Sequence, residues 1–160
     1  MVIFFKMMNS PIGVLKLISD EQCLKSISFD QEYIEIDSFT PDVLTCALKQ
    51  LEEYFSGNRK KFDLAINPEG TEFQQRVWDQ VMLLEYGYTK SYAEIARDIG
   101  SVNSGRAVGM ANGRNPIPII IPCHRIIGHN GKLTGYAGGL EKKKWLLLHE
   151  RQHSLKNGLF

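Results

Sequence analysis

The segment from Asn115 to Gly139 holds the residue types most able to do chemistry, and its centre is the triplet Cys123-His124-Arg125. A cysteine reacts as its thiolate, and a nearby imidazole or guanidinium group lowers the pKa of a thiol. The triplet therefore indicates an activated nucleophile. Neighbours in sequence need not touch in the fold, so a buried structural cysteine beside a surface histidine and arginine is the alternative interpretation.

Three prolines control how the chain reaches this triplet. Pro116, Pro118 and Pro122 restrict the residues before them to extended backbone. The four isoleucines in the same stretch favour a path through the protein interior. We therefore expect a rigid, buried tract that delivers Cys123 to its site.

Helix-start signals precede the tract. Thr71 is followed three residues later by Gln74, which is the spacing of a capping box at a helix N-terminus. Ser91 and Glu94 repeat that spacing ahead of a shorter helix. Both helices are expected to pack their apolar sides inward.

A second pair of elements resembles a DNA-reading motif. A turn at residues 101–104 separates the helix after Ser91 from a helix of small residues over about 105–113. Two short helices joined by a tight turn outline a helix-turn-helix, although many other helix pairs share this outline. A last amphipathic helix is predicted over 140–152.

The first part of the chain predicts a different architecture. Runs of β-forming residues at 2–8, 13–18 and 23–29 are separated by turn residues, which predicts an antiparallel meander, with one more short strand at 62–66. Thr40 is the expected N-cap of a helix that continues to Ser56-Gly57. We predict an α+β fold: an N-terminal α/β domain with an antiparallel sheet (residues 1–67), then a mostly helical domain (70–155).

Charge is distributed unevenly along the 160 residues. The net charge is +1, but residues 1–100 carry 10 basic and 16 acidic side chains, whereas residues 101–160 carry 9 and 2. A basic C-terminal part suggests contact with a polyanion. A solvated lysine-rich face, Lys142 to Lys144, is the alternative.

Composition excludes several classes of protein. With 43% hydrophobic and 23% charged residues, the chain is neither disordered nor fibrous. No apolar run is long enough to span a membrane, so we expect a cytoplasmic protein without a membrane partner. Its three cysteines lack paired spacing, which favours a reducing compartment, and Cys23 and Cys46 are expected to be buried spacers.

The motif IPCHRII, with NP before it and GYAGG and WLLLHE behind it, resembles the O6-alkylguanine-DNA alkyltransferases, also called methylated-DNA–protein-cysteine methyltransferases. GTEFQQRVW, SYAEIA and GRAVG also fit family segments in the right order, over about residues 70–150. Residues 1–66 match only in general character. The resemblance implies a ribonuclease H-like N-terminal domain and a winged-helix-like helix-turn-helix in the C-terminal domain.

The same resemblance implies a reaction. A protein of this family binds duplex DNA in the minor groove and flips an O6-alkylguanine out of the stack. The alkyl group would pass irreversibly to Cys123, so each molecule would act once, and O4-alkylthymine is a further candidate substrate. No cofactor is implied, and a monomer is expected. Some members hold zinc through Cys and His in the N-terminal domain, but residues 1–100 here contain no histidine, so no metal is predicted.

The resemblance also implies roles for catalytic residues. Cys123 would be the nucleophile, and His124 would take its proton through a water while Glu150 holds the imidazole. Tyr92 would supply a proton or hydrogen bond to the leaving guanine. Asn115 would orient the site by hydrogen bonding near the cysteine.

DNA contacts are implied by the resemblance in the same way. Arg106 would fill the gap left by the flipped nucleotide. Ala107 and Gly109 would be small so that the helix can approach the minor groove. Arg114 and Arg125, in the basic part, are expected to contact DNA.

The flipped base needs a pocket. Pro118 and Tyr136 are expected to line it, and backbone groups around Ala137 and Gly138 are expected to contact the base, because glycines let the chain approach closely. Some family members carry serine where this chain has Ala137. Since that contact is expected through the backbone, we expect little loss.

Three other functions fit parts of the sequence. A lesion sensor related to the family would lack the cysteine, which Cys123 argues against. A Cys/His transferase or hydrolase for small molecules would turn over repeatedly and need no DNA. A transcription factor would leave Cys123 with a structural role. The adduct formed with alkylated DNA separates these functions.

Overall fold

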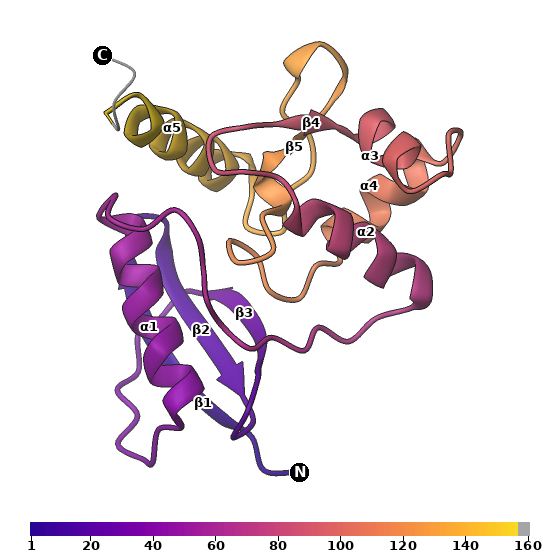
Figure 1. Ribbon diagram of the computed structural model, residues 1–160. Helices are drawn as coiled ribbons and strands as arrows, with labels where there is room; N and C mark the ends of the chain where they lie inside the picture. The colour runs from indigo at the N-terminus through magenta and orange to yellow at the C-terminus, as the bar shows by residue number, and fades with distance from the viewer. Residues whose placement is uncertain (157–160) are drawn as a thin grey trace. The chain divides into compact units, whose positions relative to one another are not determined.

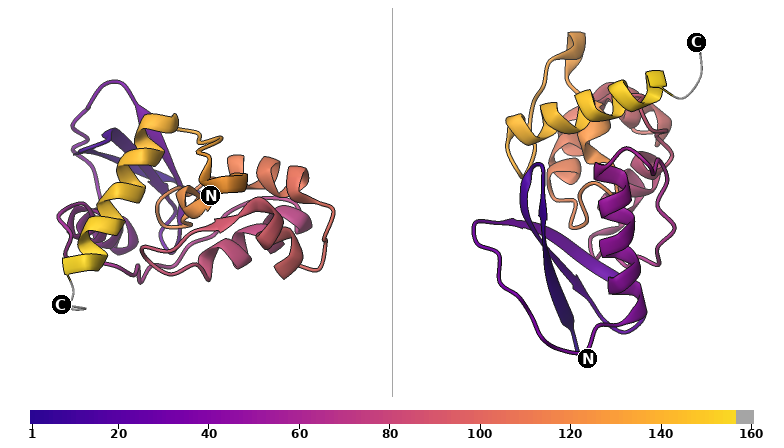
Figure 2. Two further views of the ribbon diagram at one scale, coloured as in Figure 1. Left: turned by 90° about the horizontal axis from the view of Figure 1, so that it is seen from above. Right: turned by 90° about the vertical axis from the view of Figure 1, so that its left-hand side faces the viewer.

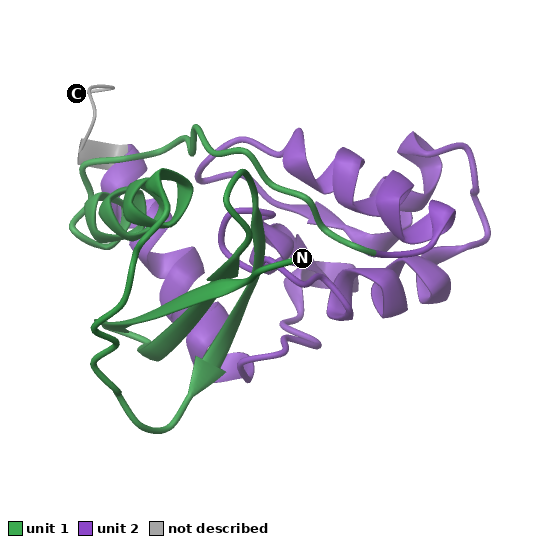
Figure 3. Cartoon of the chain, turned by 90° about the horizontal axis from the view of Figure 1, so that it is seen from below, with its two compact units in different colours: residues 1–69 green, residues 70–160 purple. Residues whose placement is uncertain are grey.

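The computed structural model describes residues 1–156 of the chain. These residues belong to two compact units, Met1–Glu69 and Gly70–Phe160, which Figure 3 shows in different colours. Within the described residues, no helix is both long and apolar enough to cross a membrane. Each unit is described by itself below.

The first unit is a three-stranded sheet with one helix. Strands β1 (Phe4–Ser10), β2 (Gly13–Ser19) and β3 (Leu24–Asp30) are antiparallel, in the order β1-β2-β3, and α1 (Asp42–Phe55) packs against them (Figure 1). Period-two alternation places Leu15 and Leu17 in the core, where both are fully buried.

Three local expectations for this unit are corrected. Thr40 does not cap α1: the N-cap is Pro41, and the Thr40 hydroxyl donates instead to the carbonyl of Ser38. The strand expected over 62–66 is reduced to one bridge between Leu24 and Ile66. Cys46 is exposed, because other side chains of α1 form its buried face.

The second unit contains the remaining elements, mostly helices. They are α2 (Glu72–Met82), β4 (Lys90–Ser91), α3 (Tyr92–Asp98), α4 (Gly105–Gly113), the 3-10 helix η1 (Cys123–Arg125), β5 (Ile126–Ile127), the 3-10 helix η2 (His129–Gly131) and α5 (Leu140–Lys156). Strands β4 and β5 pair in parallel. The capping boxes expected at Thr71 and Ser91 are both formed, at the starts of α2 and α3. Figure 2 shows α5 as one continuous helix.

Helices α3 and α4 pack together and α4 also packs on α2, which yields the helix-turn-helix (Figure 1). The fold class is α+β, as predicted.

The tract between α4 and η1 runs through the core of this unit. Ile117 and Ile119 are fully buried, and Ile121 is 1% exposed. The amide of Ile121 donates to the carbonyl of Ile117 at 2.9 Å, which closes a turn. Ile119 has φ 77°, a left-handed conformation that a β-branched residue rarely adopts. The approach to Cys123 is therefore buried, as expected.

Candidate active site

Cys123 is the first residue of η1 and only 5% of it is exposed. Burial raises the pKa of its thiol from 9.0 to about 11, and the opposing effects of a hydrogen bond from Asn115 and the charge of Lys143 do not cancel this rise. The resting cysteine is therefore a thiol. A proton acceptor is required before it can attack.

His124 is such an acceptor. It is fully buried, and its Nε2 lies 2.5 Å from Glu150 Oε2. An ionised carboxylate only accepts hydrogen bonds, so Nε2 carries the hydrogen and Nδ1 carries the lone pair. Among residues 1–156, Nδ1 has no hydrogen-bond partner. Burial lowers the pKa of His124 despite the attraction of Glu150, so the imidazole is neutral and its Nδ1 carries no proton.

Glu150 accepts hydrogen bonds from two segments of the second unit, η1 and the loop at Gly87. Its Oε1 accepts hydrogen bonds from Arg125 Nε at 2.8 Å and from the Gly87 amide at 3.1 Å, and Oε2 accepts one from Arg125 Nη2 at 3.1 Å. Burial alone would raise the pKa of this carboxyl group, but His124 and Arg125 together hold it well below its usual range. Glu150 is thus a buried, ionised carboxylate.

Arg125 does not lie where the sequence suggested. It is 5% exposed, and its Nε and Nη2 donate hydrogen bonds to Glu150. Its Nη1 donates to the carbonyl of Leu84 at 2.7 Å. The guanidinium is therefore not presented at the surface, as the expected DNA contact would require. A buried carboxylate needs a permanent cation beside it, and the planar guanidinium supplies two parallel hydrogen bonds.

Asn115 makes two side-chain hydrogen bonds to the backbone of the tract that leads to the cysteine. Its Nδ2 donates to the carbonyl of Ile121 at 2.8 Å, and its Oδ1 accepts from the amide of Ile117 at 2.9 Å. Both bonds are buried, so the turn before Cys123 is held from inside. This geometry suits the orienting role expected for Asn115.

Asn112 is a site residue that sequence reasoning missed. It lies on the buried side of α4 and is 4% exposed, and its Nδ2 donates to the carbonyl of Cys123 at 3.2 Å. Asparagine is an unfavourable residue inside a helix. An asparagine next to Val108 and Ala111 on the apolar side of the helix was the signal that could have revealed it.

Tyr92 begins α3 and is half-buried. Its hydroxyl donates to the carbonyl of Thr134 at 3.0 Å. A Cβ atom added at Gly109 would lie 3.6 Å from the Tyr92 ring, an ordinary van der Waals contact, so α4 packs beside the tyrosine at this position.

Lys143 corrects the idea of a solvated lysine face over 142–144. It is fully buried, and its Nζ donates to the carbonyl of Ile126 at 2.6 Å and to that of Thr134 at 2.8 Å. Its ammonium lies 5.9 Å from the centroid of the Tyr92 ring. Burial lowers the pKa of Lys143 to about 8, and its charge favours the thiolate form of Cys123. A positive group therefore lies inside the site, which the sequence had not shown.

The expected pocket residues differ in exposure. Pro118 is buried, Tyr136 and Gly138 are half-buried, and Ala137 is exposed. Burial, reinforced by the negative forms of Cys123 and Glu150, raises the pKa of Tyr136 well above its usual value, so the phenol keeps its proton.

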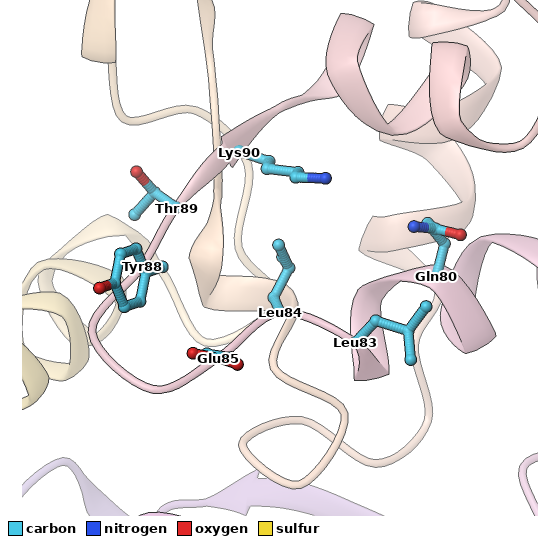
Figure 4. Close-up of a pocket in the computed structure, with 7 residues that line it drawn as sticks. All are labelled: Gln80, Leu83, Leu84, Glu85, Tyr88, Thr89 and Lys90. Atoms are coloured by element: carbon cyan, nitrogen blue, oxygen red, sulfur yellow. The ribbon is translucent and has the colours of Figure 1, made fainter.

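A cavity of about 330 Å³ lies in the same unit, and none of the residues expected to form the base pocket lines it. It is lined by the end of α2 and the loop leading to β4: Gln80, Leu83, Leu84, Glu85, Tyr88, Thr89 and Lys90 (Figure 4).

Helix α4 presents the expected DNA-facing residues on one side. Arg106 and Ala107 are exposed, Gly109 is half-buried, and Arg114, the C-cap residue, is exposed. Val108 points into the core on the opposite side. The helix contains no acidic residue.

Comparison with known proteins identifies the family. Residues 72–152 match the model of the 6-O-methylguanine DNA methyltransferase DNA-binding domain, and residues 3–68 match that of the ribonuclease-like domain of the same proteins. Together the two matches cover most of the chain. The protein belongs to the 6-O-methylguanine DNA methyltransferase family.

Individual relatives agree with this assignment. The methylated-DNA–protein-cysteine methyltransferase of Methanosarcina acetivorans is 49% identical over 90% of this chain and 96% of its own length. The protein of that name from Mycolicibacterium paratuberculosis is 45% identical over 96% of this chain and 95% of its own.

A solved structure gives the same result. The crystal structure of Mycobacterium tuberculosis O6-methylguanine methyltransferase matches with a TM-score of 0.86 and 42% identity, over 95% of this chain and 94% of that one. The structure of the M. tuberculosis protein in complex with DNA matches with a TM-score of 0.85 and 43% identity, over 93% of each chain.

Proposed function

We propose that this protein repairs DNA directly, by moving an alkyl group from O6 of a guanine in duplex DNA onto Cys123. The observation that carries the proposal is a buried cysteine followed directly by a neutral, carboxylate-held histidine, in a chain of this family. O4-alkylthymine is a second candidate substrate, because its alkyl group is also bound to an oxygen of a base.

The proton path follows from the hydrogen bonds. His124 Nδ1 takes the thiol proton through a water molecule, and Glu150 and Arg125 hold the imidazole in the tautomer that can accept it. The charge of Lys143 favours the resulting thiolate.

The transfer itself is one displacement. Cys123 Sγ attacks the alkyl carbon, an S–C bond forms, and the C–O6 bond breaks with its electron pair moving to the guanine. The hydroxyl of Tyr92 gives a proton to the base and regains one from solvent, while His124 releases to solvent the proton that it took from Cys123. The thioether product is not hydrolysed, so each molecule acts once.

Base flipping explains the exposed side of α4. We infer that this helix enters the minor groove, where Ala107 and Gly109 permit close approach and Arg106 occupies the space left by the flipped nucleotide. Arg114 would neutralise a phosphate. Pro118, Tyr136, Ala137 and Gly138 would receive the base. The M. tuberculosis relative in complex with DNA supports duplex DNA as the partner.

An intact-mass experiment tests the proposed function. The protein is incubated with an oligonucleotide duplex that carries one O6-methylguanine, and its mass is measured. We expect one added methyl group per molecule, which a Cys123→Ser variant does not acquire. Cys46→Ser is the matched control because Cys46 is exposed on α1, and it should react like the wild type.

The other outcomes identify the alternatives. Tight binding to the lesion without an adduct would indicate a lesion sensor. Repeated turnover on a small molecule would indicate a transferase or hydrolase.

We also propose that the protein acts as a monomer in the cytoplasm. All three cysteines are free thiols, which suits a reducing compartment. Light scattering of the protein alone and with duplex DNA tests the monomer, and a dimer in both states would contradict it.

A further inference from the structure

One exposed row of α4 mixes basic and apolar side chains. Arg106, Met110 and Arg114 are spaced four residues apart, so they lie one above another along the same side of the helix. All three are exposed, and Met110 is 62% exposed. We call these three residues the α4 row.

Met110 is not needed by the core of the second unit. The buried side of α4 is already formed by Val108, Ala111 and Asn112. A thioether side chain that is mostly in water contributes little to folding, whereas its burial against a partner would be favourable. The position of Met110 between two arginines therefore points to a partner that is anionic at its edges and apolar within.

The minor groove of duplex DNA has this chemistry. Phosphates lie along both edges, and the floor and walls present base edges and sugars. Proteins that bind there often push an apolar side chain, methionine among them, against or between base steps and so hold the duplex bent. No acidic residue on α4 would oppose this approach.

We propose that Met110 is an apolar wedge of this protein, which packs into the minor groove one helical turn beyond Arg106 and holds the duplex open while the base is flipped. The inference rests on the proposed function, since it needs α4 to face DNA. It adds a contact that is neither a charge nor a hydrogen bond. Arg106 fills the vacated space, and Met110 supports the deformed groove beside it.

A neutral wedge has a distinctive signature. Phosphate contacts make binding depend steeply on salt, by about 0.9 in the logarithmic slope for each phosphate neutralised. Met110 carries no charge, so its removal should weaken binding to flipped DNA without changing that slope. Arg114→Gln should lower the slope by about that amount.

The test compares two substrates. Single-turnover rates are measured on duplex DNA containing O6-methylguanine and on free O6-benzylguanine, which needs no flipping. For Met110→Ala we expect a fall of about tenfold to a hundredfold on duplex DNA, as expected for losing one buried apolar side chain, and no change on the free base. Met110→Leu should stay close to the wild type, because leucine preserves the apolar volume.

Met82→Ala is the matched control, because Met82 is also an exposed methionine, 42% exposed, at the end of α2. It should match the wild type on both substrates. The thermal midpoints of all variants should agree, since each altered side chain is exposed.

The outcomes are separable. Equal rates for Met110→Ala and the wild type on duplex DNA, or equal losses on both substrates, would overturn the wedge. A wild-type protein that reacts with neither substrate would instead contradict the proposed function.

Discussion

The side-chain amide of Asn112 donates a hydrogen bond to the carbonyl oxygen of Cys123 at 3.2 Å. Asn112 belongs to α4, the helix inferred to face DNA, and Cys123 begins η1. One buried hydrogen bond thus joins the DNA-facing helix to the nucleophile, eleven positions apart in sequence.

This bond predicts how Asn112→Leu will behave. Leucine fills a similar volume but leaves the Cys123 carbonyl without its hydrogen-bond donor, so Cys123 and the start of η1 should shift. We expect a slower reaction with free O6-benzylguanine and with duplex DNA by the same factor. Asn112 Oδ1 has no partner among the described residues, so its loss offsets part of the stability cost. A defect confined to duplex DNA would argue against this positioning role.

Replacement of Arg125 should damage folding. Arg125→Met removes the cation beside the buried carboxylate of Glu150, and breaking a buried ion pair typically costs about 3–5 kcal/mol. Urea denaturation would measure the loss, and adding Glu150→Gln should recover part of it because the unpaired charge is gone. The salt slope of DNA binding should be unchanged. A lowered slope with normal stability would restore Arg125 as a DNA contact.

Acid should destabilise the protein in two stages. Because the pKa of His124 is lowered below its ordinary 6.5, the unfolded chain takes up a proton as the pH falls through that value while the folded protein does not. The pKa of Glu150 lies below its ordinary 4.5, so a second loss of stability follows at lower pH for the same reason. Thermal midpoints recorded at constant ionic strength would reveal both.

Two histidines provide the comparison for the first stage. His124→Gln should weaken the loss near pH 6.5, whereas His129→Ala should preserve it, since His129 is exposed. The same acid profile in His124→Gln as in the wild type would contradict the assignment.

The reactivity of the cysteines should follow their burial. In a folded protein at neutral pH, iodoacetamide should modify the exposed Cys46 well before Cys123, whose thiol has a pKa raised to about 11. Below that pKa, each unit by which the pH is raised should accelerate labelling of Cys123 by about tenfold, because the thiolate fraction rises by that factor. Peptide mapping would follow each cysteine. In denatured protein, Cys46 and Cys123 should be labelled at similar rates. Rapid labelling of Cys123 at neutral pH would contradict a resting thiol.

Local signals predicted local structure well. The capping boxes at Thr71 and Ser91 depend on residues three apart, and both helices start there. The proline-rich tract depends on restrictions that act on neighbouring residues, and it is buried as expected. The same reasoning was wrong at Thr40, because α1 starts one residue later than expected and Pro41 occupies the N-cap position.

Long-range partners could not be predicted from local patterns. Arg125 and Glu150 are 25 positions apart, and no local pattern shows that the arginine turns inward. Lys143 stands between two other lysines, and only the fold shows that three carbonyl oxygens, those of Ile126, Thr134 and Gly135, surround its ammonium. Residue types alone indicated the nucleophile Cys123, but the other expected site residues came from the resemblance of the motif to a family, which carries long-range information that spacing alone does not.

The left-handed conformation of Ile119 bears on how the protein fails. A β-branched residue at φ 77° raises the energy of the native state by about 1–3 kcal/mol, and it persists only while its surroundings enforce it. The segment before the nucleophile is thus strained, and the packing of the fully buried Ile119 side chain maintains the strained conformation. When heating loosens that packing, this segment should change conformation before the helices unfold. Repair competence should therefore disappear at a lower temperature than helical structure.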